Sequence, residues 1–167
     1  MKRTVFSKGL SLFLWLLAGC CVFLQSCLHA DDLTARTKAY FDREQIRFDE
    51  NLKRCLIIPG GGCAGCIASG IYFFDFNKQH FYKSQKDNAV VFTSINSLKV
   101  LKRSLKGVDF ADYNVVIDTL NRYTVDFKEN IYPLIVYLDK GQIVKVDMQS
   151  PETDGLSYLQ QLLDVEE

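Results

Sequence analysis

One stretch decides the fold: residues 56–66, which read LIIPGGGCAGC. The apolar run at 56–58 predicts a buried strand, Pro59 and three glycines end it, and the residues that follow are typical of a helix. Cys63 and Cys66 therefore lie at a helix start, where free backbone N–H groups and the helix dipole favour the thiolate of the first cysteine. Cys63 is the candidate nucleophile, and Cys66, one turn later, is the candidate resolving thiol.

The Cys-x-x-Cys spacing alone leaves three interpretations open. The pair can be a redox centre, a structural disulfide or half of a zinc site. Zinc needs two more ligands, and the sequence has no second Cys-x-x-Cys and no His-x-x-x-His. The remaining candidate ligands are Cys55, His29 and His80. We therefore favour the redox pair and predict no metal and no other cofactor. Cys55 lies in the incoming strand, where a small buried residue is the simplest interpretation.

The N-terminus has the features of an export signal. Lys2, Arg3 and Lys8 supply a positive start, and residues 10–17 supply an uncharged apolar run. We predict that residues 1–27 are a signal segment and that the rest of the chain works outside the cytoplasm. Disulfides persist in such oxidising compartments, so a cysteine pair has partners there.

The end of this segment resembles the bacterial lipobox, in which a small residue precedes a cysteine that becomes lipid-modified. Leu-Ala-Gly-Cys ends at Cys20, and a weaker match ends at Cys27. We favour lipidation of Cys20, with Cys27 as the alternative. The resemblance implies a lipid-anchored protein of the bacterial cell envelope, facing the periplasm or the cell exterior. An uncleaved anchor, or a coincidental cysteine in a secretory signal, remains open.

Length and charge narrow the class of protein. A chain of 167 residues has room for one ordinary domain beyond the signal. Without residues 1–27, three of its 20 basic residues are lost, which leaves 17 against 20 acidic ones. A mildly acidic domain gives no electrostatic reason to expect nucleic-acid binding.

The pattern along the chain predicts alternating helices and strands. Residues 28–52 are predicted to be a linker and an amphipathic helix that packs on the sheet, and residues 53–167 to be the main domain. Within it we predict strands at 53–58, 89–95 and 114–118, helices after Cys63 and at 98–105, a hairpin at 134–146 with a glycine turn, and a closing helix after Pro151.

This order resembles the thioredoxin fold over about residues 53–165. The resemblance implies a three-layer α/β/α domain with a central mixed sheet. Cys63 and Cys66 fall on the redox cysteines of the family and Pro133 on its cis-proline, which exposes backbone for a substrate strand. Tyr132 takes the position that touches the substrate. The long interval before Pro133 has room for an added strand and helix, as in membrane-tethered envelope thioredoxin-like proteins.

Three positions depart from the thioredoxin pattern. Gly62 stands where thioredoxins usually have Trp, and Ala64-Gly65 replaces Gly-Pro between the cysteines. Ile57 occupies the position of the buried Asp that assists deprotonation of the resolving thiol in that family. We expect the glycine turn to be more open and mobile as a result.

The sequence therefore predicts a lipid-anchored thiol–disulfide oxidoreductase. Its partners are expected to be protein or small-molecule thiols and disulfides, and the membrane through the N-terminal lipid. Cys63 and Cys66 are the predicted catalytic residues; Tyr132, Pro133 and Gly62 are expected to contact the substrate. The alternative is a non-catalytic thioredoxin-fold binding or scaffold lipoprotein whose Cys63–Cys66 disulfide is structural.

Overall fold

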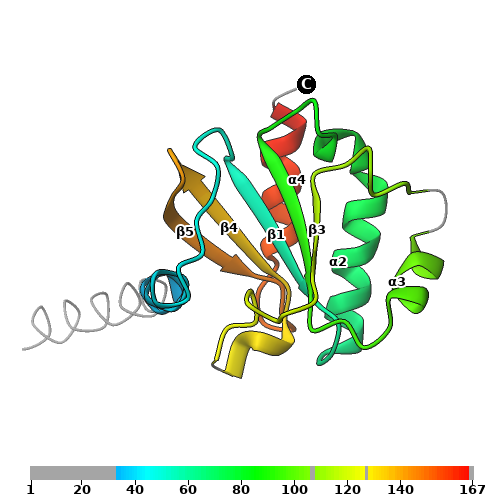
Figure 1. Ribbon diagram of the computed structural model, residues 1–167, viewed down its shortest axis with the longest axis horizontal. Coiled ribbons are helices and arrows are strands. Elements are labelled where there is room, and N and C mark those ends of the chain that lie inside the picture. Colours follow the sequence, from blue (N-terminus) through cyan, green and yellow to red (C-terminus); the bar gives the residue numbers. More distant parts are fainter. Residues whose placement is uncertain (1–32, 106–107, 127, 166–167) are drawn as a thin grey trace, which may run out of the picture.

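The computed structural model describes residues 33–105, 108–126 and 128–165. A five-stranded sheet in the order β3-β2-β1-β4-β5 forms its centre (Figure 1). The strands are β1 (Arg54–Pro59), β2 (Asn88–Thr93), β3 (Val115–Asp118), β4 (Leu134–Asp139) and β5 (Gln142–Met148). The helices are residues 33–43, α2 (Ala64–Phe76), α3 (Leu98–Ser104) and α4 (Gly155–Val165), with 3-10 turns η1 (Lys78–Phe81) and η2 (Lys128–Ile131).

The sheet is mixed, and both of its faces are covered. β1, β2 and β3 are parallel, whereas β4 pairs antiparallel with β1 and β5 antiparallel with β4. β1 and β2 are buried along their whole length, as expected for parallel strands between two layers of side chains. Alternate residues of these strands therefore belong to two different cores.

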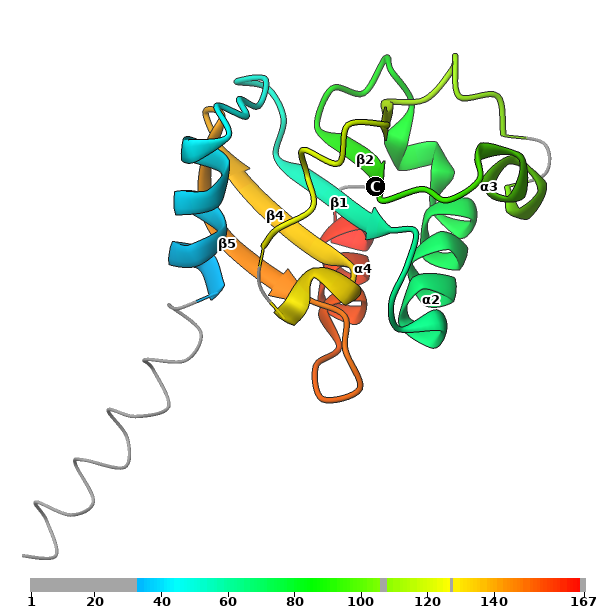
Figure 2. The same ribbon diagram turned by 60° about the horizontal axis from the view of Figure 1, so that its bottom comes forward.

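The first core lies between the sheet and helices α2, α3 and α4. Phe74 of α2 is fully buried in it, and its ring packs edge-on against Phe81, Phe92 and Tyr113. The second core lies on the opposite face, beneath the N-terminal helix and the loops that follow it (Figure 2). Two helical layers around a mixed sheet confirm the predicted three-layer α/β/α class, and the element order is that of a thioredoxin-like fold.

The N-terminal amphipathic helix is shorter than its apolar pattern indicates. It ends at residue 43, and Gln45 has a left-handed backbone with φ of 55°. Phe48 and Leu52, which keep helical spacing in the sequence, lie in the connection to β1 and still pack in the second core. Tyr40 and Phe41 bring the helix onto the sheet, as its predicted face requires.

Two contacts hold this N-terminal segment along β5 and the hairpin turn that precedes it. The Thr34 hydroxyl accepts a hydrogen bond of 3.0 Å from the N–H of Val146 in β5. At the other end, a Cβ atom placed on Gly141 would lie 2.9 Å from the Phe48 carbonyl oxygen. The segment thus runs along the β5 edge of the sheet.

The predicted hairpin and helix cap are present. Lys140 and Gly141 have φ values of 50° and 74°, which are the two left-handed residues of a type I′ turn. Ser97 caps α3 by accepting a hydrogen bond from the Val100 N–H. In the part of the chain that the structure describes, no helix is long and apolar enough to cross a membrane. The predicted signal segment, with Cys20 and Cys27, lies outside the described residues.

Candidate active site

The glycine turn after β1 packs closely against two other segments. Gly60 donates a backbone hydrogen bond of 2.7 Å to the Thr93 carbonyl at the end of β2. Gly62 has φ of +124°, and a Cβ atom placed on it would lie 2.5 Å from the Ile131 Cβ. Gly61 and Gly62 remain exposed, as expected for an open turn, but Gly62 lies directly against Ile131. Only glycine fits at position 62, which explains why the tryptophan of the thioredoxin pattern cannot stand there.

Cys63 is the N-cap of α2. Its backbone is extended (φ −67°, ψ 98°), and its sulfur accepts a hydrogen bond of 3.4 Å from the Cys66 N–H. The helix has 13 residues and no acidic side chain in its first turn, so its N-terminal dipole acts directly on this sulfur. The sequence placed the cysteine pair at a helix start, and the structure confirms that placement.

The two thiols have opposite environments. The Cys66 thiol and backbone N–H, together with the Gly65 N–H, donate to the Cys63 sulfur and lower its pKa. The hydrogen bond to Cys63 and burial both raise the pKa of Cys66, to about 11. Cys63 is partly exposed, whereas Cys66 is only 8% exposed. Both are free thiols, so one reactive and one protected sulfur stand one helical turn apart.

The segment before β4 lies beside the pair. The Cys63 N–H donates a hydrogen bond of 3.2 Å to the Ile131 carbonyl. Tyr132 is partly buried, which raises its pKa, and nearby Glu152, Cys63 and Cys66 raise it further. The predicted neighbourhood of Tyr132 and the cysteines, which are far apart in the sequence, is therefore present.

Pro133 packs against helix α2, and the peptide bond before it is trans. A Cβ atom placed on Gly70 of α2 would lie 3.2 Å from the Pro133 ring. No peptide bond between described residues is cis, so the cis-proline implied by the thioredoxin resemblance is wrong for this structure. The trans isomer before proline is favoured by about 0.5–1 kcal/mol, and a sequence alone does not reveal which isomer a fold selects. Here the Ile131 carbonyl makes the backbone contact to the cysteine pair.

Glu152 is a charged neighbour of the thiols that sequence reasoning missed. It lies in the loop between β5 and α4, where the Ser150 hydroxyl donates a hydrogen bond of 3.0 Å to its carboxylate. Its charge acts to raise the pKa of both Cys63 and Cys66. No motif or periodicity marks this position, because the loop is polar and far from the cysteines in sequence.

The other candidates lie away from the pair. Cys55 is buried on the opposite face of the sheet, and burial raises the pKa of its thiol to about 12. Ile57 is also buried there, so no carboxylate occupies that position of the thioredoxin pattern. Among residues 33–105, 108–126 and 128–165, no cluster of three or more His, Cys, Asp or Glu side chains could hold a metal ion.

No family model and no curated protein matches this chain. Among solved structures, it is similar to the pneumococcal exposed lipoprotein thioredoxin from Streptococcus pneumoniae strain TIGR4. The two share 20% sequence identity, with 70% of this chain and 87% of the other covered, at a TM-score of 0.40. The thioredoxin-like class therefore rests on the strand order and on the element order of this chain itself.

The thiol environments predict how alkylation depends on pH. We expect iodoacetamide to modify Cys63 with a midpoint below the free-thiol pKa of about 8.5, because hydrogen bonds favour its thiolate. Glu152→Gln removes a charge that opposes the thiolate, so the midpoint should move to still lower pH. Mass spectrometry of the Cys63 peptide measures the rate at each pH. A midpoint like that of free cysteine, or a shift to higher pH in Glu152→Gln, would contradict this electrostatic description.

Proposed function

We propose that the chain is a thiol–disulfide oxidoreductase that works in the bacterial cell envelope. One observation carries the proposal: a partly exposed cysteine with a lowered pKa caps a helix, next to a buried cysteine with a raised pKa. This asymmetry fits an attacking thiol and a resolving thiol. The predicted export signal supports the compartment, and the lipobox-like sequence at Cys20 supports a lipid anchor.

The exchange proceeds in two balanced steps. The Cys63 thiolate attacks one sulfur of a substrate disulfide, the substrate S–S bond breaks, and the other substrate sulfur leaves as a thiolate. Cys66 then loses its proton and attacks the Cys63 sulfur, which releases the first substrate sulfur and forms the Cys63–Cys66 disulfide. Two electrons pass to the substrate. The reverse sequence, from the oxidised pair, oxidises a substrate dithiol.

The surroundings of Cys63 have separate parts in this scheme. The helix N-terminus and the N–H groups of Gly65 and Cys66 stabilise the thiolate that attacks and later leaves. Tyr132, beside the thiols, offers a ring and backbone groups to a bound chain. Gly62 leaves the approach to Cys63 free of any side chain at that position. Glu152 places a negative charge near the site, which favours substrates with basic residues by charge complementarity.

Trapping the mixed disulfide tests the proposal. In a Cys66→Ala variant of the full chain, the first step can occur but the second cannot, so covalent complexes through Cys63 should accumulate in envelope extracts. Non-reducing electrophoresis should show them, and a reductant should release them. Cys63→Ala/Cys66→Ala is the negative control, and Cys55→Ala, which leaves the pair intact, should trap nothing. If Cys66→Ala forms no such complex, the proposal is wrong.

The scaffold alternative makes a different prediction for the same variants. Its motivation is the absence of a carboxylate at Ile57. If the pair is only a structural disulfide, Cys66→Ala should lose stability without forming complexes, and Cys63 should alkylate like a free cysteine. The trapping and alkylation measurements together therefore distinguish the two functions.

A further inference from the structure

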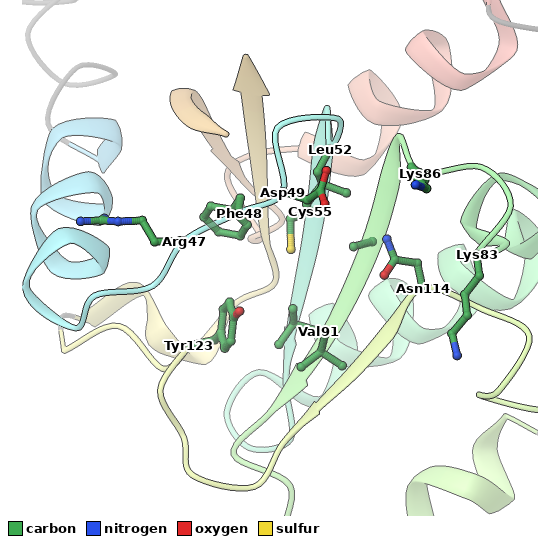
Figure 3. Close-up of a pocket in the computed structure, with 12 residues that line it drawn as sticks. Arg47, Phe48, Asp49, Leu52, Cys55, Lys83, Lys86, Val91, Asn114 and Tyr123 are labelled. Carbon is green, nitrogen blue, oxygen red and sulfur yellow. The ribbon is translucent and has the colours of Figure 1, made fainter. Parts of the chain in front are cut away.

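A pocket lies on the other face of the sheet from the cysteine pair, toward the opposite end of β1. It has a volume of about 300 Å³ and opens on the sheet face opposite α2 (Figure 3). Cys55, near the start of β1, lines it, whereas Cys63 follows the end of that strand. The apolar part of its lining consists mainly of Phe48, Leu52, Cys55, Val91, Val116 and Tyr123. It is thus separate from the proposed redox site in both face and end of the sheet.

The Phe48 and Tyr123 rings form an aromatic wall of this pocket, and Phe41 packs against both of them. The Phe48 and Tyr123 rings lie 6.4 Å apart, and both contact Phe41, at 5.8 and 5.9 Å between ring centroids. Phe41 is 2% exposed, so the wall is anchored in the second core. Burial keeps the Cys55 thiol protonated by raising its pKa to about 12, so the floor carries no charge. The pocket is an open, mainly apolar hollow, and its volume is at the lower end of the range for small-molecule sites.

The mouth of the pocket is positively charged. Arg47, Lys83 and Lys86 line it, against one acidic residue, Asp49. Arg47 points away from the cavity (Figure 3) and pairs with Asp42 at 3.1 Å. Lys83 and Lys86 lie on the opposite side, near Asn114, and neither has an ion-pair partner within salt-bridge distance among the described residues.

Asp49 offsets only part of this charge. Its carboxylate accepts two hydrogen bonds from Asn51, at 2.8 and 2.9 Å; these lower its pKa and keep it ionised, with a smaller contribution from Lys86. Because Arg47 is paired with Asp42, two lysines face one carboxylate, and the lining keeps an excess of one positive charge over a mainly apolar hollow. That combination suits a ligand with an apolar body and one anionic end.

We propose that this pocket binds a single-chain amphipathic carboxylate of the medium-chain fatty-acid type, with its tail against Phe48 and Val91 and its carboxylate beside Lys83 and Lys86. The cavity volume holds one short chain and excludes a diacyl lipid. The charge at the mouth selects a carboxylate over an alcohol of the same length. This activity is independent of the thiol chemistry proposed above.

Photo-crosslinking tests the site in the full chain. The protein, reconstituted in lipid nanodiscs, is irradiated with decanoate that carries a diazirine in its chain, and tryptic peptides are read by mass spectrometry. Label is expected in the peptides spanning residues 48–53 and 87–99, which contain Phe48 and Val91. Excess unlabelled decanoate should remove it. Label that is absent from both peptides, or that decanoate does not displace, overturns the proposal.

Charge and shape are tested by matched variants. Lys83→Gln/Lys86→Gln should lower the label on residues 48–53 and 87–99 by about tenfold, since charge-assisted hydrogen bonds are lost; in this variant trypsin releases residues 87–99 within a longer peptide, 79–99. A diazirine decanol should label the wild type weakly. Val116→Trp, at a position 39% exposed, should fill the mouth and abolish labelling without unfolding the chain. Lys99→Gln/Lys102→Gln on α3 is the control and should leave the label on residues 87–99, now carried in the tryptic peptide 87–103, unchanged. Unchanged labelling in either pocket variant, or equal labelling by the alcohol, overturns the proposed ligand.

Discussion

Gly62→Ala should be among the most damaging single changes in the chain. An alanine at φ of +124° is strained, and its Cβ would lie 2.5 Å from the Ile131 Cβ and 2.7 Å from the Ile131 carbonyl oxygen. Backbone strain and overpacking each cost about 1–3 kcal/mol, so we expect a loss of about 2–6 kcal/mol in the free energy of unfolding. Because Ile131 accepts the Cys63 N–H, the variant should also disturb the cysteine pair.

Gly61→Ala is the matched control for this change. No atom lies within 4 Å of a Cβ placed on Gly61, so its substitution should alter stability by about 0.5 kcal/mol at most. Chemical denaturation followed by circular dichroism measures both variants. If Gly62→Ala is as stable as Gly61→Ala, the close contact between the glycine turn and Ile131 does not exist in solution.

Cys63→Ser should remove almost all exchange activity. A serine hydroxyl can accept the same N–H groups, so the fold is retained, but no thiolate remains to attack a disulfide. The rate of reduction of a model protein disulfide should fall by on the order of 10³-fold or more, the scale that follows loss of an enzyme's nucleophile. A turbidity assay with insulin and dithiothreitol measures this rate.

Cys55→Ala separates loss of the nucleophile from loss of any thiol. Cys55 is buried and protonated, so its removal should leave the exchange rate within a factor of about two, even if it weakens packing by about 1 kcal/mol. Equal activity in Cys63→Ser and the wild type would show that the pair does not catalyse exchange. Loss of activity in Cys55→Ala, with the fold intact, would show that Cys55 takes part in the exchange and would contradict the assignment of the reaction to Cys63 and Cys66 alone.

The local parts of the site could be predicted from the sequence. The apolar run, the glycine turn and the cysteine spacing predicted a strand, a turn and a helix start, because each depends on neighbouring residues. The hairpin with Gly141 followed in the same way. The structure confirms these elements, and it confirms the α/β class that their order indicates.

The long-range parts could not be predicted. Glu152 approaches the thiols from a polar loop, and the Ile131 carbonyl reaches Cys63 from a 3-10 turn, neither of which has a periodic pattern. The end of the N-terminal helix could not be predicted for a different reason: Phe48 keeps helical spacing although the chain leaves the helix before it. The wall that Phe48 and Tyr123 build arises only when two distant loops meet over the sheet.

The bond between Thr34 and Val146 has a consequence for reach. Met148, two residues after Val146, pairs with Leu134 directly after Pro133, so the N-terminal helix begins in the half of the sheet that bears the cysteines (Figure 2). A lipid on Cys20 would be joined to Leu33 by thirteen residue steps, at most about 45 Å when fully extended. With such a lipid, this tether would limit how far the Cys63 and Cys66 sulfurs can move from the bilayer surface. Their substrates would then be disulfides close to the membrane.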